Sequence, residues 1–420
     1  MMRLSEQELA RHLSRLEEIG VKWAGSPGER QTRDYIQDEF EKIGLKTRVE
    51  AFDYLSCPVQ TATVQITSPV AEELHCEPVA FLEERDIEAE AVYVGTGSRQ
   101  EFETLRGLGT VLSGKIAVAV SDAPFMLTPL ALEYGAVGLL TISDTMEPEL
   151  TRHCCGAFYG TTAVPSLPAD PREFPVPLAG AMIPMHPGGH KVLSLLSAGT
   201  VRIRIANRAQ YRVAKSWNVI GEIPGQECPA ETVIIGAHYD TEYEVPGIWD
   251  NGTGVAGLIE TARALRSSGR SFRRTLVFAA FGCEEVGLWG SVDYVGRNRD
   301  DFQKNCVAFL NLDCTSGGSG VSNTVWLSGD MRESVWEAAG ELDWPIDVAE
   351  GVEATFSDYA PFRDLGIPVA WIWKYPPIHP YYHTEKDVLR TATQIPELAR
   401  VTEVTARCAA NLASSEQRPG

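Results

Sequence analysis

Three apolar runs in the second half of the chain each lead into residues that can bind a metal ion. The runs read TVIIGA, TLVFAAF and VAFLNL, and they lead into His238, into the pair Glu284 and Glu285, and into Asp313. Continuous apolar runs of this length are typical of parallel strands that are buried on both faces. Ligands of open α/β sheets bind beyond the carboxyl ends of such strands. We therefore expect an α/β fold in which these side chains converge at one edge of the sheet.

Two further segments add residues of the same kind. WDNGTG contains Asp250, and YYHTEKD contains His383 and Asp387. Each residue has a simpler explanation alone: a histidine after a strand is more often a core residue, and an aspartate before glycine is usually a turn or helix cap. Taken together, three carboxylates and two imidazoles from these segments match what two zinc-like ions need when they share a bridging carboxylate. We interpret the chain as a two-metal hydrolase.

The order of these segments carries a resemblance to a known family. HYD, DNGTG, EE, NLD and YHT follow one another as in the co-catalytic two-zinc aminopeptidases, which include bacterial leucyl aminopeptidases and aminopeptidase Y. The chain resembles this family over residues 215–415 and in the N-terminal segment AGSPGERQTRDYIQDEFEKIGL. The resemblance implies a zinc exopeptidase fold, a three-layer αβα sandwich with a mixed, mainly parallel central sheet.

The resemblance also implies which residues hold each ion. His238, Asp250 and Asp313 would bind one ion, and Asp250, Glu285 and His383 would bind the other, so that Asp250 bridges the two. Zinc is the expected metal, although cobalt and manganese suit the same ligands.

Further roles follow from the family pattern. Glu284 would be the general base toward the metal-bound water. Tyr382 matches the family tyrosine that stabilises the oxyanion, with aromatic packing as the alternative. Asp240 lies two residues beyond His238 and suits a carboxylate that accepts the other imidazole N–H. For Asp387 a similar supporting role and a turn or helix-cap role both stay open.

Two positions depart from the family pattern and bear on the substrate. Tyr359 stands where relatives often have histidine, and Trp249 stands where many have aspartate. Aromatic residues near the motifs are candidates for an apolar specificity pocket. The candidate substrate contacts among them are Trp249, Tyr359 and Trp289. Trp371, Trp373 and Tyr375 also lie close to the motifs in the sequence. The alternative is packing, since WIW after GIPVA reads as a buried strand.

The chain is longer than one usual domain. With 420 residues, 44% of them hydrophobic, it can bury more than one core. Residues 55–210 contain short β-rich runs between Gly and Pro turns and resemble a β-rich protease-associated insertion. We expect no metal ligand there, because the adjacent His153, Cys154 and Cys155 suit a loop or close packing. Residues 1–54 would then be the N-terminal part of the catalytic domain, and residues 211–420 its zinc exopeptidase part.

Hydrophobic spacing and end signals predict individual elements around these segments. We expect helices over Ser5–Ile19, Gly28–Gly44 and Gly252–Leu265, and a closing helix over 395–412. A strand is expected over Thr47–Phe52.

Charge and composition restrict the partners. The net charge is −20 without a basic cluster, which argues against nucleic acid and anionic membranes as partners. No run approaches the roughly 20 apolar residues of a membrane span. The first twenty residues are charged and lack an apolar core, so we expect no signal peptide. With nine cysteines read as reduced thiols, a cytoplasmic enzyme is expected. An oligomer is left open.

These observations lead to a functional hypothesis. We expect metal-dependent hydrolysis of peptide bonds at a free N-terminus, with a peptide or small amide as substrate. A carboxypeptidase, a dipeptidase or a small-molecule amidohydrolase would use the same residues and is the alternative. A metal-free binding scaffold, as in the distantly related transferrin receptor, is a further alternative. The complete ligand set argues against this scaffold.

Overall fold

The computed structural model of the chain divides into two compact units. Its described residues are 4–145, 147–151, 153, 175–316, 324–344, 346–350, 356–373, 380–392 and 394–419. Unit 1 holds Met1–Tyr54 and Lys215–Gly420, and unit 2 holds Leu55–Gly160 and Pro165–Ala214. Two long strands, β1 (Lys46–Ser68) and β8 (Val201–Ile223), contribute residues to both. We describe each unit by itself.

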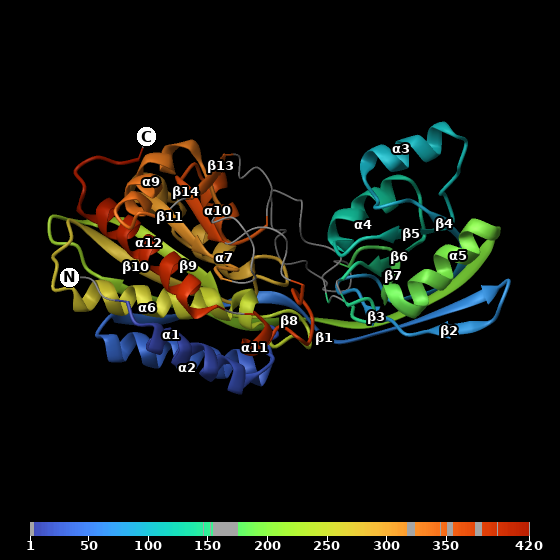
Figure 1. The fold of residues 1–420 in the computed structure, drawn as a ribbon, viewed down its shortest axis with the longest axis horizontal. Coiled ribbons are helices and arrows are strands. Elements are labelled where there is room, and N and C mark those ends of the chain that lie inside the picture. The colour runs from blue at the N-terminus through green and yellow to red at the C-terminus, as the bar shows by residue number, and fades with distance from the viewer. Residues whose placement is uncertain are drawn as a thin grey trace. The chain divides into compact units, whose positions relative to one another are not determined.

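The sheet of unit 1 is mixed and mainly parallel. Its strands follow the order β13-β12-β14-β11-β9-β10-β8 (Figure 1). Neighbours are parallel except β10 with β8 and β12 with β14. The bounds are β9 (Cys228–His238), β10 (Arg274–Phe281), β11 (Cys306–Leu312), β12 (Thr324–Leu327), β13 (Asp347–Glu350) and β14 (Val369–Trp373). Every residue of β10 and β11 is buried, as their continuous apolar sequences predicted.

Helices cover both faces of this sheet. On β11, Phe309 stacks on Phe362 of α10 with ring centroids 4.0 Å apart, whereas Leu312 points at Gly257 of α6. Residues an odd number of positions apart in a strand point to opposite faces, so α10 and α6 lie on different sides. The helix bounds are α1 (Glu6–Ile19), α2 (Pro27–Ile43), α6 (Thr253–Ser267), α7 (Trp289–Arg297), α8 (Arg299–Asn305), α9 (Arg332–Gly340), α10 (Tyr359–Asp364), α11 (Leu389–Ala392) and α12 (Ile395–Ser414). The predicted three-layer α/β fold is confirmed.

The N-terminal helices begin and end at the signals in the sequence. Ser5 caps α1 by accepting the N–H of Glu8 at 3.2 Å. Gly44 ends α2 in the left-handed conformation, with φ of 82°. The strand predicted over Thr47–Phe52 is longer than expected, because residues of β1 beyond Phe52 continue to pair, for example Val64 with Leu74 of β2 (Glu72–Leu74).

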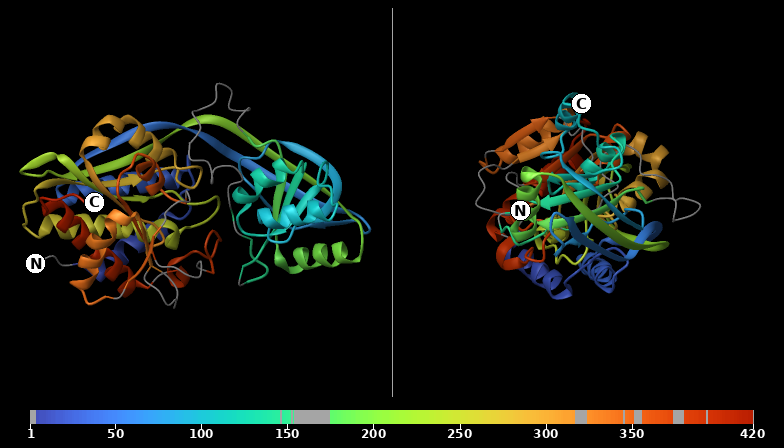
Figure 2. Two further views of the ribbon diagram at one scale, coloured as in Figure 1. Left: turned by 90° about the horizontal axis from the view of Figure 1, so that it is seen from above. Right: turned by 90° about the vertical axis from the view of Figure 1, so that its right-hand side faces the viewer.

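Unit 2 has a core of its own around a second set of strands. The strand order is β8-β4-β5-β6-β7-β3, with parallel pairs β4–β5, β5–β6 and β6–β7. The α4 helix packs on β6 and α5 packs on β4 (Figure 2). Among the described residues of the unit, the helices α3, α4 and α5 accompany the strands, so this part is more helical than its β-rich description suggested. The bounds are β2 (Glu72–Leu74), β3 (Glu77–Pro78), β4 (Arg85–Tyr93), β5 (Ile116–Val120), β6 (Gly138–Ser143), β7 (Ala179–Pro184), α3 (Arg99–Gly107), α4 (Pro124–Glu133) and α5 (His190–Ala198).

Over the described ranges we find no helix with the length and apolar character needed to cross a bilayer.

A buried histidine in unit 1 generates a prediction on stability. Burial, together with the charge of the neighbouring Arg11, lowers the pKa of His12 to about 4. Its Nδ1 lies 2.6 Å from the hydroxyl of Tyr35 on α2. The unfolded chain protonates this group near its ordinary pKa of about 6.5, so it binds more protons than the folded chain between pH 6.5 and 4. The stability that the protein gains from keeping His12 neutral is therefore fully present above pH 6.5 and is lost as the pH falls toward 4.

We expect the metal-free protein to lose roughly 2 kcal/mol of unfolding free energy through this group between pH 7 and pH 5. Urea unfolding at several pH values measures the loss, and His12→Gln should remove this part of the pH dependence. His75→Gln, at a side chain that is 71% exposed, is the matched control. Equal pH dependence in wild type and His12→Gln would contradict the prediction.

Candidate metal centre

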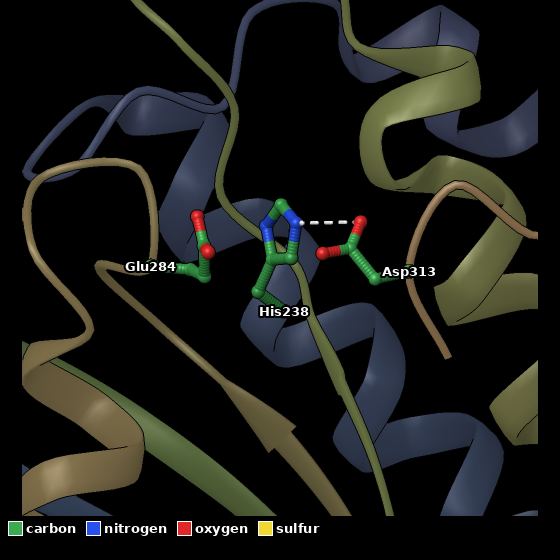
Figure 3. Close-up of side chains that lie close together, drawn as sticks. All are labelled: His238, Glu284 and Asp313. Atoms are coloured by element: carbon green, nitrogen blue, oxygen red, sulfur yellow. Dashed lines mark ion pairs between the residues drawn. The ribbon is translucent and has the colours of Figure 1, made fainter. Parts of the chain in front are cut away.

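The predicted ligands meet where the parallel strands of unit 1 end. His238 is the last residue of β9, Asp313 directly follows β11, and Glu284 lies three residues beyond β10. All three side chains are buried. Figure 3 shows the carboxylates of Glu284 and Asp313 on opposite sides of the His238 imidazole.

Each histidine lies at the centre of a triad of possible ligands. The Nε2 atom of His238 lies 3.1 Å from Oδ1 of Asp250 and 3.4 Å from Oδ1 of Asp313. The Nε2 atom of His383 lies 3.2 Å from Oδ2 of Asp250 and 3.3 Å from Oε2 of Glu285. Ligand atoms bound tetrahedrally at about 2.0–2.2 Å from one zinc ion lie roughly 3.3 Å apart. The two triads therefore have zinc-like dimensions.

Asp250 belongs to both triads, one oxygen in each. Its Oδ1 faces His238 and its Oδ2 faces His383. Within the described residues, Oδ1 of Asp250 and Oδ1 of Asp313 are buried and accept no hydrogen bond. Buried carboxylate oxygens normally have a partner, and two that face a common imidazole nitrogen suit a shared cation. The donor set thus fits two ions bridged by Asp250.

Asp387 holds the backbone of the bridging residue. Its Oδ1 accepts the N–H of Trp249 at 2.7 Å and its Oδ2 accepts the N–H of Asp250 at 3.1 Å. The sequence left open whether Asp387 supports the site or caps a turn, and these contacts favour support. Asn251 adds a second tie, because its Nδ2 donates to the carbonyl of Leu312 at 2.9 Å.

Asp240 supports the site in a different manner from the one predicted. The carboxylate that was expected to accept the N–H of His238 lies 3.7 Å from Nδ1, whereas the backbone carbonyl of Asp240 is closer, at 3.2 Å. The two carboxylate oxygens accept the backbone N–H groups of Glu284 and Glu285 at 3.0 and 3.2 Å. The reason is that the extended segment after His238 directs this carboxylate at the turn that follows β10. Asp240 therefore orients the two glutamates.

The electrostatics of the cluster show excess negative charge. Burial raises the pKa of Glu285 to about 8, and Asp250 adds to this effect. Burial also raises the pKa of Glu284, although His238 opposes it. Burial alone would lower the pKa of His238, yet the carboxylates of Glu284 and Asp313 raise it well above its usual value. Carboxylates that retain protons beside imidazoles that gain them require added positive charge to ionise fully.

The predicted aromatic residues lie around the cluster and are mostly buried. The ring of Tyr382 stacks on His383 with centroids 3.6 Å apart, and Trp249 meets Tyr382 edge to face at 5.7 Å. Tyr359 is fully buried, and Trp289 donates its indole N–H to the carbonyl of Val286. These contacts agree with the packing alternative, and substrate contacts stay a prediction. Trp371 donates to the carbonyl of Asp313, and Tyr375 lies outside the described residues.

Sequence reasoning missed two buried carboxylates at the centre. Glu242 contributes a ligand atom to a group with Glu285 and His383, in which all ligand atoms lie within 4.8 Å of one another. Glu242 lies two residues beyond Asp240, and the alternation of an extended segment was the signal that could have found it. Asp358 is fully buried, and burial raises its pKa to about 7. Asp358 could have been found from the sequence by its position directly before Tyr359, a residue that was already singled out.

Unit 2 contributes no ligand to the candidate groups formed by the described residues. His153 is buried and belongs to none of these groups. Cys154 and Cys155 lie outside the described residues.

Comparison with known proteins agrees with this centre. Residues 218–409 match the family model of peptidase family M28. Aminopeptidase YwaD of Bacillus subtilis is 27% identical over 415 residues, which cover 91% of this chain and 81% of YwaD. The probable glutamate carboxypeptidase VP8 of Zea mays is 26% identical over 444 residues, covering 88% of this chain. The chain spans only 60% of the length of the maize protein.

Solved structures share the fold. The aminopeptidase from Aneurinibacillus sp. strain AM-1 has a TM-score of 0.72 at 23% identity, with 100% of this chain and 95% of that chain covered. BSAP, a zinc aminopeptidase from Bacillus subtilis, has a TM-score of 0.72 at 21% identity, with 99% and 97% covered. Residues 218–409, the part of the chain that matches the family M28 model, contain both triads and Glu284.

Proposed function

We propose that this chain is a two-zinc aminopeptidase that hydrolyses the peptide bond after a free N-terminal residue. The observation that carries the proposal is the pair of histidine-centred triads that share Asp250, one oxygen to each imidazole. The names of YwaD and BSAP, both aminopeptidases, support the direction of cleavage. Peptides with a free amino group are the proposed substrates, and the abundance of carboxylates at the centre favours a cationic amine.

The residues of the chain suggest how the reaction proceeds. Two divalent ions held by the triads would lower the pKa of a bound water and polarise the scissile carbonyl. Glu284 lies beside His238 opposite Asp313, outside both proposed ligand sets, and would accept the proton of the water and donate it to the leaving amine (Figure 3). Its backbone is fixed by Asp240 and by the N–H groups of Gly287 and Leu288, which donate to its carbonyl at 2.9 Å. Tyr382 remains the proposed oxyanion donor.

A carboxypeptidase is the second candidate function, because VP8 and several other relatives are named probable glutamate carboxypeptidases. This chain spans about 60% of the length of VP8 and of AMP1 from Arabidopsis thaliana. The activity in their names is therefore a weaker guide to the function of this chain than the name of YwaD. For the rest of the chain, we propose that residues 55–210 are a protease-associated insertion and that the enzyme works in the cytoplasm.

The first prediction concerns the metal content. Purified protein should bind close to two divalent ions per chain and lose activity when a chelator removes them, because each triad needs its own ion. His238→Ala and His383→Ala should each lose mainly one ion, measured by elemental analysis after dialysis. His75→Ala is the control and should retain both. Full activity after exhaustive chelation would contradict the two-metal assignment.

The second prediction separates the adjacent glutamates. Glu284→Gln retains the shape of the side chain but cannot accept a proton, so turnover should fall by roughly a hundredfold to ten-thousandfold while both ions stay bound. Glu285→Gln should weaken the ion of the His383 triad and lower thermal stability, and added metal should restore part of the loss. Kinetics together with metal analysis distinguish the two variants. The assignment is reversed if Glu284→Gln loses an ion and Glu285→Gln keeps both.

The third prediction concerns the direction of cleavage. Aminoacyl reporter amides with a free amino group should be hydrolysed with a kcat/KM roughly a hundredfold or more above that of the N-acetylated amides, since an acetylated nitrogen carries no charge. Peptides blocked at the C-terminus should remain substrates. Preferential release of C-terminal residues from N-blocked peptides would instead establish the carboxypeptidase alternative.

A further inference from the structure

Glu242 is a buried carboxylate beside the triad of Asp250, Glu285 and His383. Only 2% of it is exposed, and its ligand atom lies within 4.8 Å of those of Glu285 and His383. Oxygen and nitrogen ligands about 2.0–2.4 Å from one ion lie at most about 4.8 Å apart. All three side chains can therefore reach a common ion.

The chain holds Glu242 in a tight turn. The N–H of Val245 donates to the Glu242 carbonyl at 3.2 Å, and Glu244 takes a left-handed conformation with φ of 61°. The N–H of Tyr243 donates to Oε2 of Glu242 at 3.0 Å, which orients the carboxylate. A carboxylate that accepts one such hydrogen bond still has lone pairs with which to bind a cation. Glu244, two residues on, is exposed to solvent.

The turn is also attached to the N-terminal segment. The N–H of Lys22 donates to the hydroxyl of Thr241 at 3.0 Å, and its ammonium donates to the carbonyl of Pro246. Trp23 packs edge to face on Tyr243, with centroids 5.7 Å apart. Glu242 is thus held at the centre by contacts on both sides of it in the sequence.

The two triads differ in their extra neighbour. At the His383 triad the additional carboxylate is Glu242. At the His238 triad it is Glu284, which forms a candidate group with His238 and Asp313. Glu284 already has a proposed role as the general base, whereas Glu242 has none.

We propose that Glu242 is a fourth protein ligand of the ion bound by Asp250, Glu285 and His383. This inference rests on the proposed function only in requiring that the centre binds metal. The two positions are then unequal: the His383 position has the larger number of oxygen donors and suits Mn²⁺ better than the His238 position does.

Metal titration of the full-length apoprotein tests this proposal. Zn²⁺ and Co²⁺ are titrated in the presence of a competing chelator, and Glu242→Gln is compared with Glu244→Gln, which makes the same change two residues away. Glu242→Gln should weaken one of the two ions by about tenfold or more and leave the other unchanged. Glu244→Gln should match wild type. The visible absorption of the Co²⁺ protein, which reports coordination geometry, should change only in Glu242→Gln.

Unchanged affinities and an unchanged Co²⁺ spectrum in Glu242→Gln would overturn the proposal. A raised KM for substrates with a free amino group, with both ions bound as in wild type, would overturn it too and would assign Glu242 to the substrate amine. If Glu242→Gln does not fold, as judged by circular dichroism, Glu242→Asp keeps the charge on a shorter side chain and should weaken the same ion. A chain without aminopeptidase activity would leave these affinities unaffected, so the two proposals fail independently.

Discussion

The centre of unit 1 depends on the cost of burying negative charge. Leaving a buried carboxylate without a partner cation costs several kcal/mol, and this chain buries the carboxylates of Asp250, Glu284, Glu285 and Asp313 within one cluster. Among the described residues, the imidazoles in the candidate ligand groups are those of His238 and His383. Two imidazolium groups cannot balance four ionised carboxylates, so the cluster favours the binding of metal cations.

Backbone hydrogen bonds give this cluster its shape. Asp240 accepts two N–H groups from the turn after β10, and Asp387 accepts two from the segment that carries the bridging aspartate. Both carboxylates orient peptide groups rather than ligand side chains. The rigid backbone thereby sets the geometry of the ligands. The ligand side chains are buried and extend only a short way from it to reach the ions.

Part of this organisation could be predicted from the sequence. The ends of β9, β10 and β11 were visible because an apolar run followed by a polar residue is a local pattern, and parallel pairing brings such ends together. The contacts of Asp387 could not be predicted, because its partner Asp250 lies 137 residues away and neither residue type specifies the other. Glu242 was overlooked because a glutamate in a turn normally faces solvent. The helices of unit 2 were missed because short apolar runs fit a strand and a buried helix equally well.

The position of Asp387 has a consequence for the order in which the centre can form. Asp387 and His383 come from the last tenth of the chain, whereas His238 and Asp250 precede them by more than a hundred residues. The contacts that hold the bridging ligand are therefore complete only after the end of the chain has docked. A nascent or partly unfolded chain lacks one complete triad and the support of the residue shared by both. Metal binding at the His383 triad is thus coupled to the docking of the last elements of unit 1.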